Sequence, residues 1–168
     1  MKSLAIEDVR VLGEIPPPQF IAPMRETALD TDPKEIHQRF ADDAYVCLPG
    51  FFTNDNVSAV REAVFTRLDE AGEIRGTPSD GIYSGTSQRR ENISDLGGFW
   101  REISENWSLR RVTHSRALHE LCDVLLNERS IPQDYLFLRA ANFGRKTLIH
   151  SDSGFFARMT DKVVTVWI

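Results

Sequence analysis

The chain has 168 residues, of which 41% are hydrophobic and 27% charged, and its formal net charge is −5 at pH 7. This length suits one domain with a real core, and the composition is that of ordinary globular proteins. The acidic balance argues against a protein that binds nucleic acid along a basic face. No apolar run reaches the ~18 residues of a transmembrane helix, and the N-terminal segment lacks the apolar stretch of a signal peptide.

The cysteine pattern narrows the class further. Cys47 and Cys122 lie far apart in the sequence and form no CxxC pair. This excludes a disulfide scaffold and a zinc finger as organising principles. We expect two buried thiols in a reducing compartment, and therefore a cytoplasmic protein.

Residues 1–32 are expected to form an extended N-terminal arm, because the prolines at 16–18 favour polyproline II. A helix is predicted from Pro33, since Asp32 is a good N-cap and proline suits the first helical position. Apolar residues recur at a spacing of four along this helix, and we predict that they form its buried face. These residues are Ile36, Phe40 and Ala44.

A short strand over residues 45–48 is predicted to end at the Pro49-Gly50 turn, which Phe51 and Phe52 follow. Thr53 or Asn54 can cap a second helix that ends at Gly72. Its predicted buried stripe is Val57, Val60, Val64 and Leu68. Residues 72–98 have no period and are expected to form a long loop, either a lid, a binding loop or disorder. They contain no phosphate-binding GxxxxGK[ST] motif.

Two more helices are expected, over residues 99–106 and from Leu109 to about residue 128. The apolar side of the longer one is predicted to be Leu109, Val112, Leu118, Leu121, Cys122 and Leu125, and its wet face Arg110, Arg111 and Arg116. Strands are predicted over residues 135–140, 147–150 and 163–168. Helices followed by strands indicate an α+β fold.

His150-Ser151-Asp152 is the main candidate for chemistry. In an extended segment, residues two apart point to the same side, so the imidazole and the carboxylate can reach one metal ion. The facial triad of non-haem iron oxygenases needs such a pair and one more histidine. An HxD pair alone is a weak signal, because a loop histidine beside a solvated aspartate gives the same pattern.

The surrounding sequence strengthens this candidate. Residues 36–64 read IHQRFADDAYVCLPGFFTNDNVSAVREAV, and residues 138–168 read LRAANFGRKTLIHSDSGFFARMTDKVVTVWI. Both stretches resemble the phytanoyl-CoA dioxygenase family of iron(II)- and 2-oxoglutarate-dependent oxygenases. In that family a helix leads to a strand ending in L-P-G-F/L, and T-x-x-H-x-D precedes a strand containing W-hydrophobic-P-L. The resemblance covers residues 33–168, with the loop at 72–98 unmatched.

The resemblance implies helices packed on a partial double-stranded β-helix of the jelly-roll or cupin type. It implies that residues 33–168 are the N-terminal portion of such a domain. It also implies Fe(II) as the metal, 2-oxoglutarate as cosubstrate, and a small organic molecule, not nucleic acid or membrane, as the partner. His150 and Asp152 would be two iron ligands. Residues that would lie near 2-oxoglutarate are Trp167, Arg139 and Thr147.

Each of these last three has a simpler interpretation, namely a core tryptophan, a surface arginine and an ordinary strand threonine. The family also has a third iron ligand, a histidine, and an arginine that pairs with 2-oxoglutarate, both beyond the HxD pair. Residues 153–168 contain no histidine. His37, His114 and His119 lie in the helical half, so we expect none of them to replace it. We therefore expect a C-terminally truncated domain, with fewer strands than a closed jelly roll needs.

Three functions stay open. In the first, the parent protein is an oxygenase, and the chain by itself turns over slowly or not at all. Alternatively, the chain is a non-catalytic binding or assembly module, an inactive remnant. In the third, a second chain supplies the missing strands, histidine and arginine. The substrate is not readable, although Tyr83, Arg89 and Arg90 in the loop could either meet an anionic substrate or be solvated.

Overall fold

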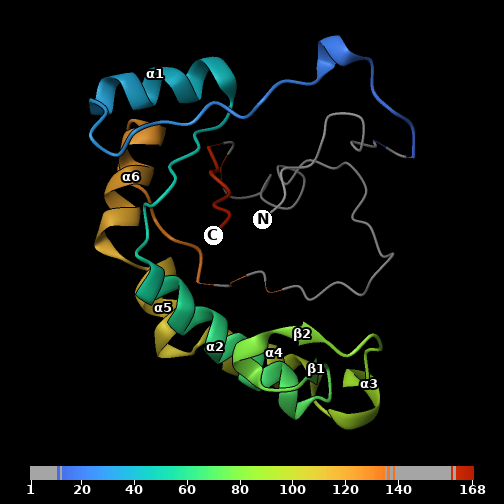
Figure 1. The fold of residues 1–168 in the computed structure, drawn as a ribbon. Coiled ribbons are helices and arrows are strands. Elements are labelled where there is room, and N and C mark those ends of the chain that lie inside the picture. Colours follow the sequence, from blue (N-terminus) through green and yellow to red (C-terminus); the bar gives the residue numbers. More distant parts are fainter. Residues whose placement is uncertain (1–10, 12, 135, 137, 139–159, 161) are drawn as a thin grey trace.

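The computed structural model describes residues 11, 13–134, 136, 138, 160 and 162–168, and the structural statements below concern these residues. The helices are η2 (Pro18–Phe20), α1 (Pro33–Asp43), α2 (Asn54–Glu70), η3 (Pro78–Asp80), α3 (Arg89–Asn92), α4 (Leu96–Ser104), α5 (Trp107–Thr113) and α6 (Arg116–Leu126). Two short strands, β1 (Ile74–Arg75) and β2 (Ile82–Tyr83), form an antiparallel hairpin. In Figure 1, α1 lies beside α6, while α2 lies with α4, α5 and the hairpin.

The predicted first helix is confirmed as α1, and its cap forms as expected. The Asp32 side chain accepts a hydrogen bond of 2.8 Å from the Lys34 amide, and Pro33 occupies the first helical position. Ile36 is buried, but Ala44 lies beyond the helix, where it takes a left-handed conformation with φ 59°. The apolar face of α1 therefore ends at Phe40, one turn before Ala44, the last residue of the predicted stripe.

The strand predicted over residues 45–48 is wrong. The structure has one parallel bridge there, between Glu26 and Cys47, in which the Thr27 amide donates to the Cys47 carbonyl at 2.8 Å. The segment then turns at Pro49-Gly50, where the Phe51 amide donates to the Leu48 carbonyl at 3.2 Å. Gly50 has φ 77°, the conformation that the third residue of a type II turn requires after proline.

Helix α2 begins and ends where the sequence predicts. The Thr53 hydroxyl accepts from the Asn56 amide at 3.3 Å. At the other end Gly72 has φ 78°, and the Gly72 and Glu73 amides donate to the carbonyls of Asp69 and Leu68. This pair of bonds is a Schellman motif, which satisfies carbonyls that the helix leaves open.

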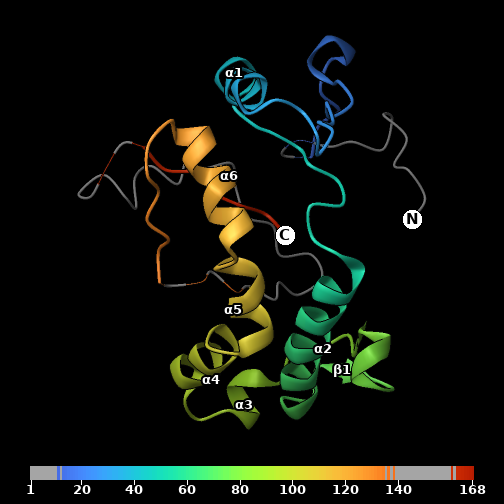
Figure 2. The same ribbon diagram turned by 90° about the vertical axis from the view of Figure 1, so that its left-hand side faces the viewer.

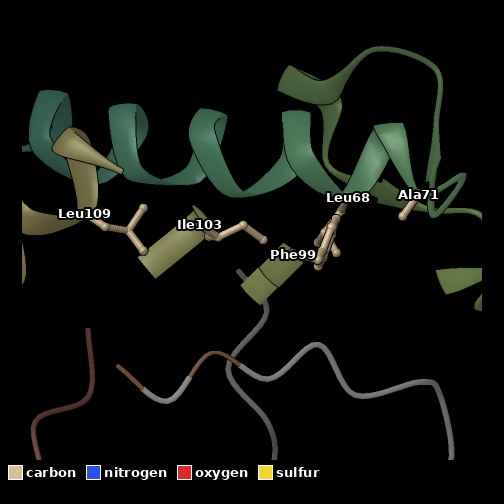
Figure 3. Packing of buried hydrophobic residues seen from close by; sticks show 5 residues of the cluster. All are labelled: Leu68, Ala71, Phe99, Ile103 and Leu109. Carbon is tan, nitrogen blue, oxygen red and sulfur yellow. The ribbon is translucent and has the colours of Figure 1, made fainter. Parts of the chain in front are cut away.

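One side of α2 carries the hydrophobic core. Figure 3 shows its five buried residues in a row beneath the helix. They are Leu68, Ala71, Phe99, Ile103 and Leu109. At the far end of the predicted stripe, Val57 is exposed (43%).

The sequence predicts a long loop over residues 72–98, but the structure has regular elements there. It holds the hairpin, η3 and α3, and α4 begins within it at Leu96. Asp95 caps α4 by accepting from the Gly98 amide at 2.9 Å. Short elements without hydrophobic periodicity escape a method that depends on periodicity.

The long helix predicted from Leu109 is also wrong, because it is two helices. His114 ends α5, and Ser115, with ψ 145°, caps α6 by accepting from the Leu118 amide at 3.3 Å. The two helices follow one another closely in Figure 2. The apolar spacing continues across the break, which is why it indicated one helix.

Of the three strands predicted near the C-terminus, only residues 163–168 lie wholly within the described part of the chain. The predicted strand 147–150 and most of 135–140 fall outside the described residues. Residues 163–168 are described, and the structure shows no strand there. A strand needs a neighbouring strand to complete its hydrogen-bond ladder, so β propensity alone does not make one. The jelly roll, the arm at 1–32 and the domain at 33–168 stay predictions.

Candidate functional site

The predicted iron pair, His150 and Asp152, lies outside the described residues, as do Arg139 and Thr147. Trp167 is described, and its side chain is 92% exposed instead of buried in a core. Trp167 is the one predicted cosubstrate residue within the described part of the chain, so its placement relative to the other two stays a prediction. In that part, no group of three or more histidine, cysteine or acidic side chains is placed to hold a metal.

One concave surface in the described residues lies where the chain turns back after α6. It is an open cleft of about 520 Å³. Its lining residues are His119, Asp123, Arg129, Ser130, Ile131 and Pro132. The segment 127–134 forms one wall, running beside α6 towards α5 (Figure 2).

Ser130 attaches this segment to α6. Its backbone amide and its hydroxyl both donate to Oδ1 of Asp123, each at 2.6 Å. These two bonds, the hydroxyl's first, hold the pKa of Asp123 below its usual value. Asp123 is therefore a stable carboxylate at neutral pH.

Serine, histidine and aspartate meet in this cleft, but they do not form a nucleophilic relay. In such a relay the histidine accepts the serine proton and the carboxylate orients the histidine. Here the Ser130 hydroxyl donates to Asp123, and His119 Nε2 has no hydrogen-bond partner in the structure. The arrangement fixes a turn, and we assign it no hydrolytic chemistry.

The remaining histidines of the described residues have structural contacts. His37 Nδ1 lies 3.1 and 3.2 Å from the carbonyl oxygens of Val124 and Leu125, at the end of α6. His114 contacts Arg110 and Thr113 through its two ring nitrogens. Both rings therefore take part in contacts that connect helices or turns of the described residues.

The loop arginine Arg89 is not solvated. Its Nε donates to Oε1 of Glu73 at 2.6 Å, and its guanidinium lies 5.0 Å from the centre of the Trp100 ring. Glu73 is 2% exposed and also accepts from the Ser87 hydroxyl. This buried cluster, absent from the sequence analysis, holds the hairpin and α3 onto the helices. The sequence contains one indication of this cluster, a glutamate directly after the glycine that ends α2. This pattern is too common to predict a buried ion pair.

Neither cysteine is bonded in a disulfide, and both are half-buried. Burial, with a smaller effect of Asp123, raises the pKa of the Cys122 thiol. A thiol whose pKa is raised is a poor nucleophile at neutral pH, because the thiolate is the reactive form. The two thiols are therefore less buried than the sequence predicts.

Within the described residues, no helix is both long and apolar enough to cross a bilayer. In comparisons with protein-family models, curated proteins and solved structures, nothing matches this chain.

Proposed function

We propose that this chain carries part of an iron(II)- and 2-oxoglutarate-dependent dioxygenase that hydroxylates a small organic substrate. His150 and Asp152 are the proposed iron ligands. The observation that carries the proposal is the order of two motifs, L-P-G-F-F after a helix and T-x-x-H-x-D before V-W-I.

The structure supports the first motif locally. Helix α1, the turn at Pro49-Gly50 and helix α2 follow one another in the order that the resemblance implies, but the strand implied before the turn is reduced to a single bridge at Cys47. Each boundary also has its own physical cause, in the Asp32 cap and the Gly50 turn. This support concerns the scaffold, whereas the chemistry rests on the second motif.

The proposed chemistry divides between the metal and the protein. When bound, Fe(II) and 2-oxoglutarate would activate O₂, the oxidant: one oxygen atom would enter the substrate as a hydroxyl and the other would enter succinate as 2-oxoglutarate loses CO₂. The chain supplies an imidazole at 150 and a carboxylate at 152, which suit Fe(II) in a facial site. Within this chain we identify two of the three ligands, and therefore expect little or no turnover from it alone.

A non-catalytic binding module is the second candidate. The observation that favours it is the engagement of His37 and His114 in structural hydrogen bonds, which leaves them unsuited to act as a third ligand. The two candidates differ in one property: only the oxygenase binds Fe(II) and 2-oxoglutarate through His150.

The test is an anaerobic titration of the purified chain with Fe(II) and 2-oxoglutarate, followed by the metal-to-ligand charge-transfer band. We expect a band that His150→Ala and Asp152→Ala abolish. The matched control is His119→Ala, which removes a histidine that has no hydrogen-bond partner at Nε2 and should leave the band unchanged. A folded wild-type chain without a band would overturn the oxygenase proposal and favour the binding module. A band that survives His150→Ala would overturn the ligand assignment.

A further inference from the structure

The ring of His114 lies at the break between α5 and α6, and its hydrogen bonds define its protonation state. Nε2 lies 2.9 Å from Arg110 Nη1, and Nδ1 lies 2.9 Å from the Thr113 hydroxyl oxygen. A guanidinium can only donate, so Nε2 accepts. The Thr113 hydroxyl gives its one hydrogen to the Leu109 carbonyl at 3.0 Å, so it accepts from Nδ1. The network is complete only with a neutral imidazole that carries its hydrogen on Nδ1.

The same guanidinium attaches the chain after α6 to α5. Arg110 Nη1 donates to Oδ1 of Asp134 at 3.2 Å, and Nη2 donates to the Asp134 carbonyl at 3.1 Å. Nη2 also donates to Glu105. The two terminal nitrogens carry four hydrogens, and the four acceptors are His114, Asp134 twice, and Glu105. The Arg110 side chain is only 16% exposed, so the surrounding residues leave its guanidinium little room to exchange these acceptors for water.

We propose that His114 is a proton-sensitive residue that controls how Arg110 anchors Asp134. A second proton would be placed on Nε2, the atom that now accepts from Arg110. That hydrogen bond would become a contact between two donors and two positive charges. Arg110 would then move away from His114, and the bonds that hold Asp134 to α5 would be lost with it.

The charges around the ring oppose this second proton. Arg110 faces it from α5, and the His119 ring of α6 lies 6.5 Å away. Two carboxylates favour it, Glu105 before α5 and Asp134 on the returning segment, but both are exposed, Asp134 to 98%. Water screens exposed charges, so the contact with Arg110 dominates. In accord with this geometry, burial, then Arg110 and then His119 lower the pKa of His114.

The direction of the pH effect follows from this arrangement. The unfolded chain takes up the His114 proton near the ordinary histidine pKa of about 6.5, while the folded protein takes it up only at lower pH. Between these two values the unfolded state binds more protons. The anchor therefore loses stability as the pH falls below about 6.5, and regains it on neutralisation.

The anchor lies directly before residues 135–168. The inference rests on the described contacts of Arg110, His114 and Asp134, and it does not depend on the proposed iron chemistry. The inference depends on two contacts of Arg110: His114 accepts a hydrogen bond from its guanidinium, and Asp134 is attached to the same guanidinium.

The experiment measures two quantities on the whole chain. Proton NMR of the histidine Cε1 hydrogens, assigned with single His→Gln variants, gives the titration midpoint of His114. Hydrogen exchange read by mass spectrometry gives the protection of residues 127–134 at about pH 7.5 and pH 5.5, with exchange times scaled to the intrinsic rates. We expect a midpoint below that of a free histidine and a loss of protection at the lower pH. Once His114 is fully protonated, the opening equilibrium of residues 127–134 should increase tenfold for each pH unit by which the His114 midpoint lies below that of a free histidine.

His114→Gln is the decisive variant, because glutamine keeps an oxygen that accepts from Arg110 but does not titrate. It should keep its protection at the lower pH. His119→Gln is the matched control and should still lose protection, because His114 remains. Equal loss in His114→Gln and wild type would overturn the proposal. If His114→Gln does not fold, a wild-type midpoint at or above that of a free histidine would overturn it instead.

Discussion

Glu73 and Arg89 form an ion pair that is almost fully buried, with side chains 2% and 12% exposed and 2.6 Å between Oε1 and Nε. Glu73 owes its position to the Schellman end of α2, since Gly72 turns the chain so that the next residue points into the core. The pair therefore connects the end of a long helix with the start of a short one, across a segment that the sequence predicts to be a loop.

The first prediction concerns this pair. Glu73→Ala removes a carboxylate from beside a guanidinium that is largely out of water. Breaking a buried pair in this way costs about 3–5 kcal/mol. Urea unfolding followed by circular dichroism should show that loss. The control is Arg116→Ala, at a pair whose arginine side chain is 92% exposed, which should leave the unfolding midpoint unchanged. Equal midpoints for Glu73→Ala and wild type would contradict the prediction.

The second prediction compares two glycines with positive φ. At Gly81, φ +61°, an added Cβ would lie 2.3 Å from Phe65 Cε2. At Gly85, φ +99°, it would meet nothing within 4 Å. Both alanine variants bear backbone strain of about 1–3 kcal/mol, and Gly81→Ala adds an overpacking cost of about 1–3 kcal/mol. Thermal unfolding should therefore place Gly81→Ala below Gly85→Ala. The reverse order would show that the hairpin packs on α2 differently.

The third prediction concerns the contact between α1 and α6. The carbonyls of Val124 and Leu125 can only accept, so His37 Nδ1 donates to them and caps the last turn of α6. His37→Ala should cost about 1 kcal/mol, a typical net value for one hydrogen bond. Gln38→Ala, on the same helix, removes only a bond to the Asp42 side chain and serves as the control. Equal unfolding midpoints for the two variants would exclude the cap.

The fourth prediction is an acid dependence at Asp123. Its pKa is lowered by the Ser130 hydroxyl and amide, so its contribution to stability is complete above the unfolded value of about 3.9 and is lost as the pH falls towards the folded value. Urea midpoints measured from about pH 5 to pH 2.5 should fall less steeply in Asp123→Asn than in wild type. Ser130→Ala keeps the amide bond and should lie between them. Parallel curves for all three would refute the assignment.

The helix boundaries that could be predicted are those with local chemistry. Asp32, Thr53 and Gly72 act within a few residues of their own position, through hydrogen bonds that a short sequence specifies. The same reasoning missed the break at Ser115. A serine in front of an apolar run can equally be an exposed residue within one helix, and the distinction depends on what packs around it.

The candidate site was less predictable than the helices. The sequence predicts Arg110 on the wet face of a helix, yet it binds Glu105, His114 and Asp134 with its side chain 16% exposed. Its most distant partner is 24 residues away, so no local pattern could reveal this role. The iron pair at 150 and 152 remains a prediction from motif order.

The segment between α2 and α4 returns to its own starting point. Asn92 Nδ2 donates to the Ala71 carbonyl at 3.1 Å, so residues 71 and 92 are neighbours. An excursion whose two ends meet can be shortened or exchanged as a unit, because the helices on either side already have a fixed separation. A short glycine-containing bridge from residue 71 to residue 93 would therefore span the gap between α2 and α4, and it would test how much the Glu73–Arg89 pair and the hairpin contribute to the α2 core.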